Sequence, residues 1–378
     1  MLSYWEKQSL LQYDYIIIGS GIVGLSAAIS LKDKVPAARV LVLEREILPT
    51  GASTKNAGFA CIGSLTEILA DLQTMPHETV LHLVSLRLAG LQLLRRRLGD
   101  RIMGYEENGS FELISAAEEW ALPRLEEVNH LLSPLFNGQP AFSRADGKLP
   151  GFGFATQQIK SLIRNNFEGE LHTGKMMRAL IDTAISAGVE IKTGCPVKDL
   201  HDFHTGVGVT VTNHTLQEEM EFRARKVLVC TNAFTRALIP EETINPGRGQ
   251  VLITEPISHL PFKGIFHMNE GYYYFRELEG RILLGGGRQL DFEGETTTSF
   301  GFSSHIQQEL EHLLHTVILP GREVTIADRW TGIMAFGPDK QPLVKMHSPN
   351  VVLGVRMGGM GVAIGSMIGD QIADMALT

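Results

Sequence analysis

The chain has 378 residues, of which 44% are apolar and 20% charged, and its formal net charge at pH 7 is −8. This length is enough for two domains of ordinary size, and the negative charge disfavours nucleic acid and anionic membrane surfaces as main partners. We expect no membrane insertion, because the longest glycine-rich apolar stretch, residues 357–369, is too short to span a bilayer. The N-terminal segment, residues 1–14, also lacks the basic start and apolar core of a signal peptide.

The cysteines Cys61, Cys195 and Cys230 are widely spaced and form no CxxC motif. This pattern fits a reducing cytoplasm and argues against a disulfide framework or a zinc site. The histidine pairs of the sequence come without a matching set of carboxylates or cysteines. We therefore expect a cytoplasmic protein with no bound metal.

The segment 14–45 predicts a strand, a glycine turn, a helix and a second strand. A short β-branched run, Tyr15–Ile18, is followed at once by Gly19, Gly21 and Gly24 in the order GxGxxG. In such a turn the first glycine allows the tight bend, the second lets the backbone approach a pyrophosphate, and the third lets the helix pack closely on the sheet. The N-terminus of the helix then directs its free N–H groups at the phosphates.

The second strand of this unit, Arg39–Leu43, ends at Glu44, twenty residues after Gly24. An acidic side chain at this distance is expected to meet the ribose hydroxyls, and it argues against a ribose 2′-phosphate. The unit therefore predicts FAD or NAD rather than NADP. A glycine-rich turn in another kind of α/β protein is the alternative, but the agreement of strands, glycines, helix and acid favours a dinucleotide site.

The segments after this unit predict two sheets. Residues 50–64 are small and polar, so they can wrap a ligand closely, and helical periodicity follows Pro76 and covers Thr173–Ala187. The β-rich runs fall into a group that continues the first sheet, at Val189–Lys192, Gly208–Thr212 and Val227–Cys230, and a group that predicts a separate antiparallel sheet, at Val251–Thr254, Gly271–Arg276 and Arg281–Gly285.

The C-terminal stretch predicts a second arrangement of strand, glycine turn and helix. Val351–Val355 is typical of a buried strand and Gly358–Met360 of a turn that enters a terminal helix. The N-terminus of this helix can face an electron-rich group of a cofactor, such as the N1 and C2 carbonyl edge of a reduced flavin. Simple packing of glycine and alanine against a sheet is the alternative.

Taken together, these segments resemble the D-amino acid oxidase superfamily of FAD-dependent oxidoreductases, particularly its glycine oxidase and sarcosine oxidase-like branch. The matching motifs follow the order of the family along nearly the whole chain: GSGIVG with Glu44, GASTKNAG at 51–58, CPV at 195–197, VLVCTNAF at 227–234, INPGRGQ at 244–250, YYYFRELEGRILLGGG at 272–287, WTGIMAFGPDKQP at 330–342 and the final glycine turn. The resemblance implies an α/β fold in which a Rossmann-like FAD-binding domain, residues 1–75, 171–235 and 325–378, carries an inserted antiparallel-sheet α+β substrate domain, residues 76–170 and 236–324.

The resemblance also implies which residues hold FAD, and that they hold it noncovalently. They surround its pyrophosphate, ribose, adenine and flavin ring: Gly19, Ser20, Gly21, Val23, Gly24, Glu44, Arg45, Ser53, Asn56, Ala57, Gly58, Val197, Asn232, Ala233, Gly332, Gly358, Gly359, Met360, Gly361 and Val362.

Three positions depart from the family pattern. Met334 stands where glycine oxidase-like members carry an arginine that grips the substrate carboxylate, and methionine cannot form that charge-assisted pair. Gly332 stands where sarcosine oxidase-like members carry a cysteine bonded to the flavin, and Leu283 where they carry an oxygen-activating lysine. An ordinary amino acid substrate is thereby in doubt, and the electron acceptor is oxygen or another compound.

The family resemblance predicts an enzyme that oxidises the C–N bond of a small amine or amino acid derivative by hydride transfer to flavin N5, giving an imine that hydrolyses. Candidate residues of the substrate pocket are Tyr272, Tyr274, Arg276, Trp330 and Met334. Alternation along the strand puts Tyr272, Tyr274 and Arg276 on one face. Arg276 can then replace the missing carboxylate anchor, or it can form a structural salt bridge.

Two other interpretations remain open. A non-catalytic or regulatory flavoprotein fits the loss of both the aligned arginine and the aligned lysine. An NAD-dependent dehydrogenase fits the glycine motif alone, but it leaves segment 51–58 and the final glycine turn without a role.

Overall fold

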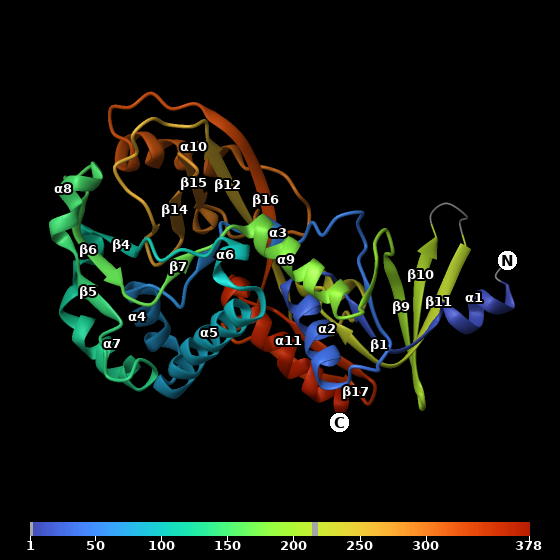
Figure 1. Ribbon diagram of the computed structural model, residues 1–378. Coiled ribbons are helices and arrows are strands. Elements are labelled where there is room, and N and C mark those ends of the chain that lie inside the picture. Colours follow the sequence, from blue (N-terminus) through green and yellow to red (C-terminus); the bar gives the residue numbers. More distant parts are fainter. Residues whose placement is uncertain (1–2, 214–217) are drawn as a thin grey trace.

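The computed structural model describes residues 3–213 and 218–378, so the first two residues of the expected FAD-binding domain lie outside the described residues. Two large β-sheets form neighbouring parts of the molecule, and in Figure 1 the long helices lie beside the first sheet and below the second. Within the described ranges, no helix combines the length and the apolarity needed to cross a bilayer.

The first sheet is built on parallel strands with nearly continuous apolar sequence. Its order is β17 (Leu343–Ser348), β18 (Val351–Val355), β11 (Glu218–Val229), β1 (Gln12–Ile18), β2 (Val40–Leu43) and β8 (Glu190–Lys192). All neighbours in this row are parallel except β17 and β18. Every residue of β2 and β18 is buried, as expected of strands covered on both faces.

An antiparallel ribbon extends this sheet. β11 is longer than its parallel neighbours, and its first half pairs with β10 (Gly206–Asn213), which pairs with β9 (Val197–Phe203). The ribbon projects from the side of the molecule that carries the described N-terminal end (Figure 1).

Helices cover one face of the first sheet: α2 (Ile22–Lys34), α5 (His77–Leu98), α9 (Thr173–Ser186) and α11 (Gly361–Leu377). Small residues allow these helices to pack closely, because a Cβ on Gly90 of α5 would lie 2.1 Å from the carbonyl oxygen of Ala363 in α11. The contact shows that α5, which we expected in the substrate domain, packs on the helices of the first sheet (Figure 1).

The second sheet has the order β16 (Ile326–Phe336), β12 (Asn245–Thr254), β15 (Arg281–Gly286), β14 (Tyr273–Leu278), β13 (Ile265–Met268), β4 (Ser110–Ser115), β6 (Ile159–Asn165) and β5 (Phe142–Arg144). Its pairs are antiparallel except β13 with β4. The expected boundary near residue 325 therefore comes one strand too early, because β16 pairs along its length with β12 of this sheet.

Aromatic packing fixes which face of β14 reaches the core. The rings of Phe266 and Phe275 stack with centroids 4.7 Å apart, and Tyr273 is buried in the same cluster. Tyr274 therefore lies on the opposite face of β14, which is turned toward the first sheet.

The remaining α-helices and strands of the described chain are α1 (Tyr4–Ser9), α3 (Ala52–Lys55), β3 (Phe59–Ala60), α4 (Leu65–Thr74), α6 (Asp100–Met103), α7 (Leu125–Leu132), α8 (Leu149–Phe152), β7 (Gly169–Glu170) and α10 (Ser304–Leu313).

Candidate active site

A cavity of about 750 Å³ lies between the two sheets. One part of its wall comes from residues that follow the carboxyl ends of β1, β2, β11 and β18, where α/β sheets commonly bind ligands. The residues expected from the sequence that line it are Gly19, Ser20, Gly21, Val23, Glu44, Arg45, Ser53, Asn56, Ala57, Val197, Asn232, Tyr272, Tyr274, Gly332, Met334, Gly358, Gly359, Met360, Gly361 and Val362.

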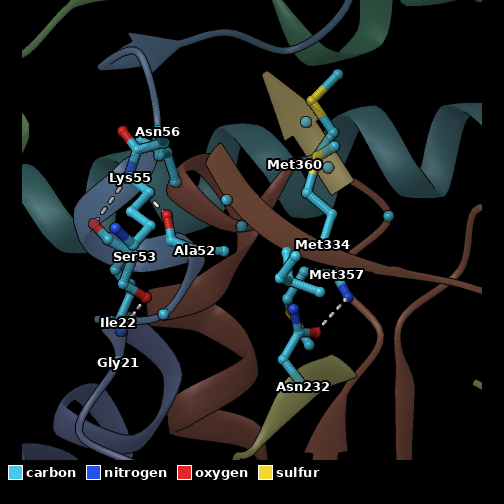
Figure 2. A pocket seen from close by; sticks show the side chains of 18 of the residues that line it. Gly21, Ile22, Ala52, Ser53, Lys55, Asn56, Asn232, Met334, Met357 and Met360 are labelled. Carbon is cyan, nitrogen blue, oxygen red and sulfur yellow. Dashed lines mark hydrogen bonds between the residues drawn. The ribbon is translucent and has the colours of Figure 1, made fainter. Parts of the chain in front are cut away.

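The glycine turn makes a narrow cradle at the start of α2. Gly21 precedes this helix and has no side chain with which to cap it. The backbone N–H of Ile22 donates to Ser53 Oγ at 3.0 Å (Figure 2). A Cβ on Gly21 would lie 2.7 Å from that oxygen, so only glycine leaves the space between α2 and α3 open. Gly24 lies outside the cavity wall, and it serves packing instead, because its Cβ would lie 1.9 Å from the carbonyl oxygen of Gly19.

Glu44 is a buried acid held at the end of β2. Its Oε2 accepts hydrogen bonds from the backbone N–H of Ser20 at 3.1 Å and from the Ser20 hydroxyl at 2.6 Å. The neighbouring Arg45 guanidinium lies 3.8 Å from the ring centroid of Phe234. Acid, arginine and the apolar side chain of Val197 at this end of the cavity suit the ribose and adenine of a dinucleotide.

A second helix N-terminus opens on the same cavity. Asn232 Oδ1 accepts hydrogen bonds from the backbone N–H groups of Arg356 at 3.0 Å and Met357 at 3.3 Å, and so holds the turn before α11. No side chain caps α11. Figure 2 shows Asn232, Met334, Met357 and Met360 together, across from the segment that carries Ser53 and Asn56. These two helix N-termini and the acid at position 44 fit an adenine dinucleotide with a redox-active ring.

Aromatic side chains line the wall formed by the second sheet. Tyr274 packs edge-on against Phe59 with ring centroids 5.5 Å apart, and burial raises the pKa of Tyr274 to about 12. Its hydroxyl is therefore neutral across the physiological range and can donate a hydrogen bond. Tyr272, Phe292 and Phe336 extend this aromatic wall.

A charged cluster that the sequence did not reveal lies at another part of the wall. Lys340 Nζ is 2.5 Å from Asp71 Oδ1 and 3.4 Å from Glu67 Oε1, and Arg87 Nη2 is 3.6 Å from the same Glu67 oxygen. His267 lies among them, and burial lowers its pKa to about 4, so the imidazole is neutral. The members come from distant parts of the chain, and no spacing rule links them. Among the residues with assigned structure, no group of acids, histidines and cysteines is arranged to hold a metal ion.

The family model of DAO, described as FAD dependent oxidoreductase, matches residues 14–375. The chain belongs to this family. Membership confirms the expected fold class and the expected family of FAD-dependent oxidoreductases, and the cavity supplies a fitting dinucleotide site.

Curated relatives match at low identity. The bifunctional protein ThiO/ThiG of Nostoc sp. is 22% identical over 96% of this chain, and the probable oxidoreductase OrdL of Haemophilus influenzae is also 22% identical over 96%. The match covers 83% of OrdL but only 52% of the Nostoc protein. The chain thus spans about half the length of the bifunctional relatives.

Solved structures show the same fold. Glycine oxidase from Geobacillus kaustophilus superposes with a TM-score of 0.77 at 19% identity, covering 97% of this chain and 95% of the other. L-proline dehydrogenase from P. horikoshii has a TM-score of 0.74 at 16% identity, covering 97% and 92%. The family fold therefore extends over nearly the entire chain.

Some expected site residues of this DAO family chain lie outside the cavity wall: Gly24, Gly58, Ala233, Arg276 and Trp330. Arg276 does not replace the missing carboxylate anchor, because its Nη1 donates to the carbonyl oxygens of Leu171 at 2.8 Å and Gly58 at 3.2 Å. Its Nε lies 3.5 Å from Glu170 Oε2. Of the two roles expected for Arg276, carboxylate anchor and structural salt bridge, the structure shows the salt bridge. Trp330 donates its indole N–H to the carbonyl oxygen of Lys55 and so holds the end of α3.

Proposed function

We propose that this chain oxidises the C–N bond of a small amine or amino acid derivative with noncovalently bound FAD. The observation that supports this most directly is the continuity of the cavity, which runs from the dinucleotide cradle to an aromatic pocket on the second sheet. Similar structures include a glycine oxidase, an L-proline dehydrogenase and an iminodiacetate oxidase, and the substrates in these names are all amines.

FAD supplies the hydride acceptor when it is bound. The chain contributes the environment of the reaction. The uncapped N-terminus of α11 presents N–H groups and the positive end of the helix dipole to the cavity, which favours negative charge there. The apolar wall disfavours a charged ammonium group, because desolvation favours the neutral amine.

Residues around the aromatic pocket orient the substrate and exclude water. The neutral hydroxyl of Tyr274 can donate to a polar group of the substrate, and Tyr272 stands beside it on the same wall. Met334 contributes an apolar, adaptable surface. Gly332 offers no nucleophile for a covalent flavin link.

Anaerobic mixing of the purified holoprotein with amines tests the proposal. The panel contains glycine, L-proline, N-methylglycine, both enantiomers of alanine, and putrescine, and the visible flavin band is followed. Bleaching by one class, with release of the matching carbonyl product, supports amine oxidation. A band that dithionite bleaches but no amine does would overturn the proposal in favour of a non-catalytic flavoprotein. Release of yellow FAD on acid precipitation tests noncovalent binding.

A further inference from the structure

Arg288 enters the cavity from a position that no sequence motif marked. It begins a short turn directly after β15, in the segment Arg288–Leu290. A Cβ on Gly286 would lie 2.0 Å from the carbonyl oxygen of Tyr272, and Gly287 has φ +80°, so the chain presses against β14 and then turns sharply. This turn places Arg288 on the cavity wall.

The guanidinium of Arg288 is attracted by the carboxylate of Glu295 but forms no ion pair with it. Its Nε is buried without a hydrogen-bond partner, and the side chain makes no hydrogen bond or ion pair with another described residue. Glu295 is already engaged, because Arg248 Nη2 and Gln250 Nε2 donate to its Oε1 at 2.7 and 2.9 Å. Burial lowers the pKa of Arg288, and the attraction of Tyr272 and Glu295 offsets this effect only in part.

Aromatic rings hold the guanidinium in place without neutralising it. Its central carbon lies 4.3 Å from the ring centroid of Phe336 and 5.1 Å from that of Phe292. Stacking of this kind fixes the plane of the group while its N–H donors stay free for a ligand.

The position of Arg288 relates it directly to Met334. A Cβ on Gly247 would lie 2.9 Å from Arg288 Nε, and a Cβ on Gly249 would lie 3.0 Å from Met334 Cε. These glycines are two residues apart on β12, so they share one face and are about 7 Å apart. The side chains of Arg288 and Met334 therefore lie near each other, over Gly247 and Gly249 of β12.

Other cations on the wall are less suited to an incoming anion. Lys340 is paired with Asp71 and Glu67. Arg45 lies at the Glu44 end of the cavity, 3.5 Å from Glu46. Lys55 is the remaining rival, and its ammonium lies 5.3 Å from the ring centroid of Phe300.

We propose that Arg288 binds a carboxylate of the substrate, supplying from the end of β15 the cation that position 334 lacks. A planar guanidinium can hold both oxygens of a carboxylate at once, which fixes orientation as well as charge. The inference rests on the proposed function and narrows its substrates to amines that carry a carboxylate.

Paired probes that differ only in charge test this assignment. Benzoate and benzamide have the same shape, fit an aromatic wall, and have no hydrogen on a carbon bonded to nitrogen that the enzyme could remove. Binding to the FAD-loaded protein is measured by calorimetry and by the flavin difference spectrum. We expect wild type to prefer benzoate, and Arg288→Gln to weaken benzoate binding roughly 10- to 100-fold while benzamide changes little. Arg288→Lys should retain part of the preference.

Control variants separate charge at this position from other effects. Arg281→Gln removes a partly exposed arginine paired with Glu255, and it should leave the preference intact. Lys55→Gln removes the rival cation. The assignment would be overturned if wild type bound the two probes equally or bound neither of them. It would also be overturned if the preference for benzoate survived Arg288→Gln or disappeared with Lys55→Gln.

Two further outcomes distinguish this inference from the proposed function. Benzoate selectivity that depends on Arg288, in a protein whose flavin no amine reduces, would uphold the anion site and reject amine oxidation. Reduction of the flavin by amines in a protein that does not prefer benzoate would uphold amine oxidation and reject the anion site. Because Arg288 makes no hydrogen bond to a described residue, both Arg288 variants should unfold near the wild-type temperature, and collapse of both would assign it a structural role instead.

Discussion

Gly21 and Gly24 belong to one motif, but different neighbours restrict them. An alanine methyl at position 24 meets the backbone oxygen of Gly19 at 1.9 Å, whereas at position 21 it meets the hydroxyl of Ser53 at 2.7 Å. We expect Gly24→Ala to destabilise even the FAD-free protein by about 1–3 kcal/mol or more. Gly21→Ala should fold but bind FAD at least roughly tenfold more weakly, because the added methyl fills the space in which the backbone approaches the pyrophosphate.

Thermal unfolding without FAD and fluorescence titration with FAD measure these two effects separately. Gly147→Ala is the matched control, since no atom lies within 4 Å of its added methyl. Wild-type FAD affinity in Gly21→Ala, or wild-type stability in Gly24→Ala, would contradict the division of roles.

Glu168 gives a prediction on pH. Burial raises its pKa from 4.5 to about 7. Between these values the unfolded chain has released a proton that the folded chain still holds, so this group lowers stability as the pH rises through that window. In Glu168→Gln the amide oxygen can still accept from the N–H groups of Ile62 and Gly63, and its NH₂ can donate to Ser110.

We therefore expect the melting temperature of Glu168→Gln, relative to wild type, to increase as the pH rises from about 4.5 to 7. Melting curves of both proteins across this range measure the difference, which cancels the titration of other groups. A difference that stays constant or falls with pH would show that Glu168 is ionised in the folded protein.

Residues whose role depends on local spacing could be predicted from the sequence. The glycines of the first turn, Glu44 and the turn at Gly358–Met360 all line the cavity or pack beside it. Arg288 and the Lys340 cluster could not be predicted, because their neighbours come from segments far apart in the sequence. Alternation along β14 correctly predicted that Tyr274 faces the cavity. Alternation does not predict which groups a long side chain such as Arg276 contacts.

At the scale of elements, the turn before α11 depends on one side chain from the segment that follows β11. Asn232 has φ +47°, and its Oδ1 receives the N–H groups of Arg356 and Met357. Asn232→Gly tolerates that backbone angle but removes the acceptor. We expect weaker FAD binding, by roughly tenfold, because the helix N-terminus loses its fixed position.

Fluorescence titration with FAD measures this loss, and Asn350→Ala is the control. Asn350 donates to Asp202 in the antiparallel part of the first sheet, away from the cavity. Unchanged FAD affinity in Asn232→Gly would show that the turn keeps its shape without the asparagine.

Strands with a strong apolar pattern were predicted well, and those without it were not. β1, β2 and β18 are buried runs that the sequence reveals. β9 is mostly exposed and shows no regular alternation. β16 precedes the C-terminal strand and helix in sequence, yet its partner β12 lies far upstream. Pairing of this kind is decided by tertiary contacts that a local pattern does not contain.

For the whole molecule, Arg276 fastens the second sheet to the segments that lead into α9 and away from α3. It is 5% exposed, belongs to β14, and donates to the carbonyl oxygens of Gly58 and Leu171 beside the carboxylate of Glu170. Arg276→Met leaves that carboxylate buried without a counter-charge. We expect a loss of about 3–5 kcal/mol in the free energy of unfolding, measured by denaturant titration.

The double variant Arg276→Met/Glu170→Gln tests the cause. Removing the acid as well eliminates the unpaired charge but leaves the carbonyl oxygens of Gly58 and Leu171 without their donor, so stability should return only in part. A single-variant loss of only about 0–1 kcal/mol, the contribution of an exposed ion pair, would show that water reaches Glu170. The two sheets would then be held together mainly by apolar packing.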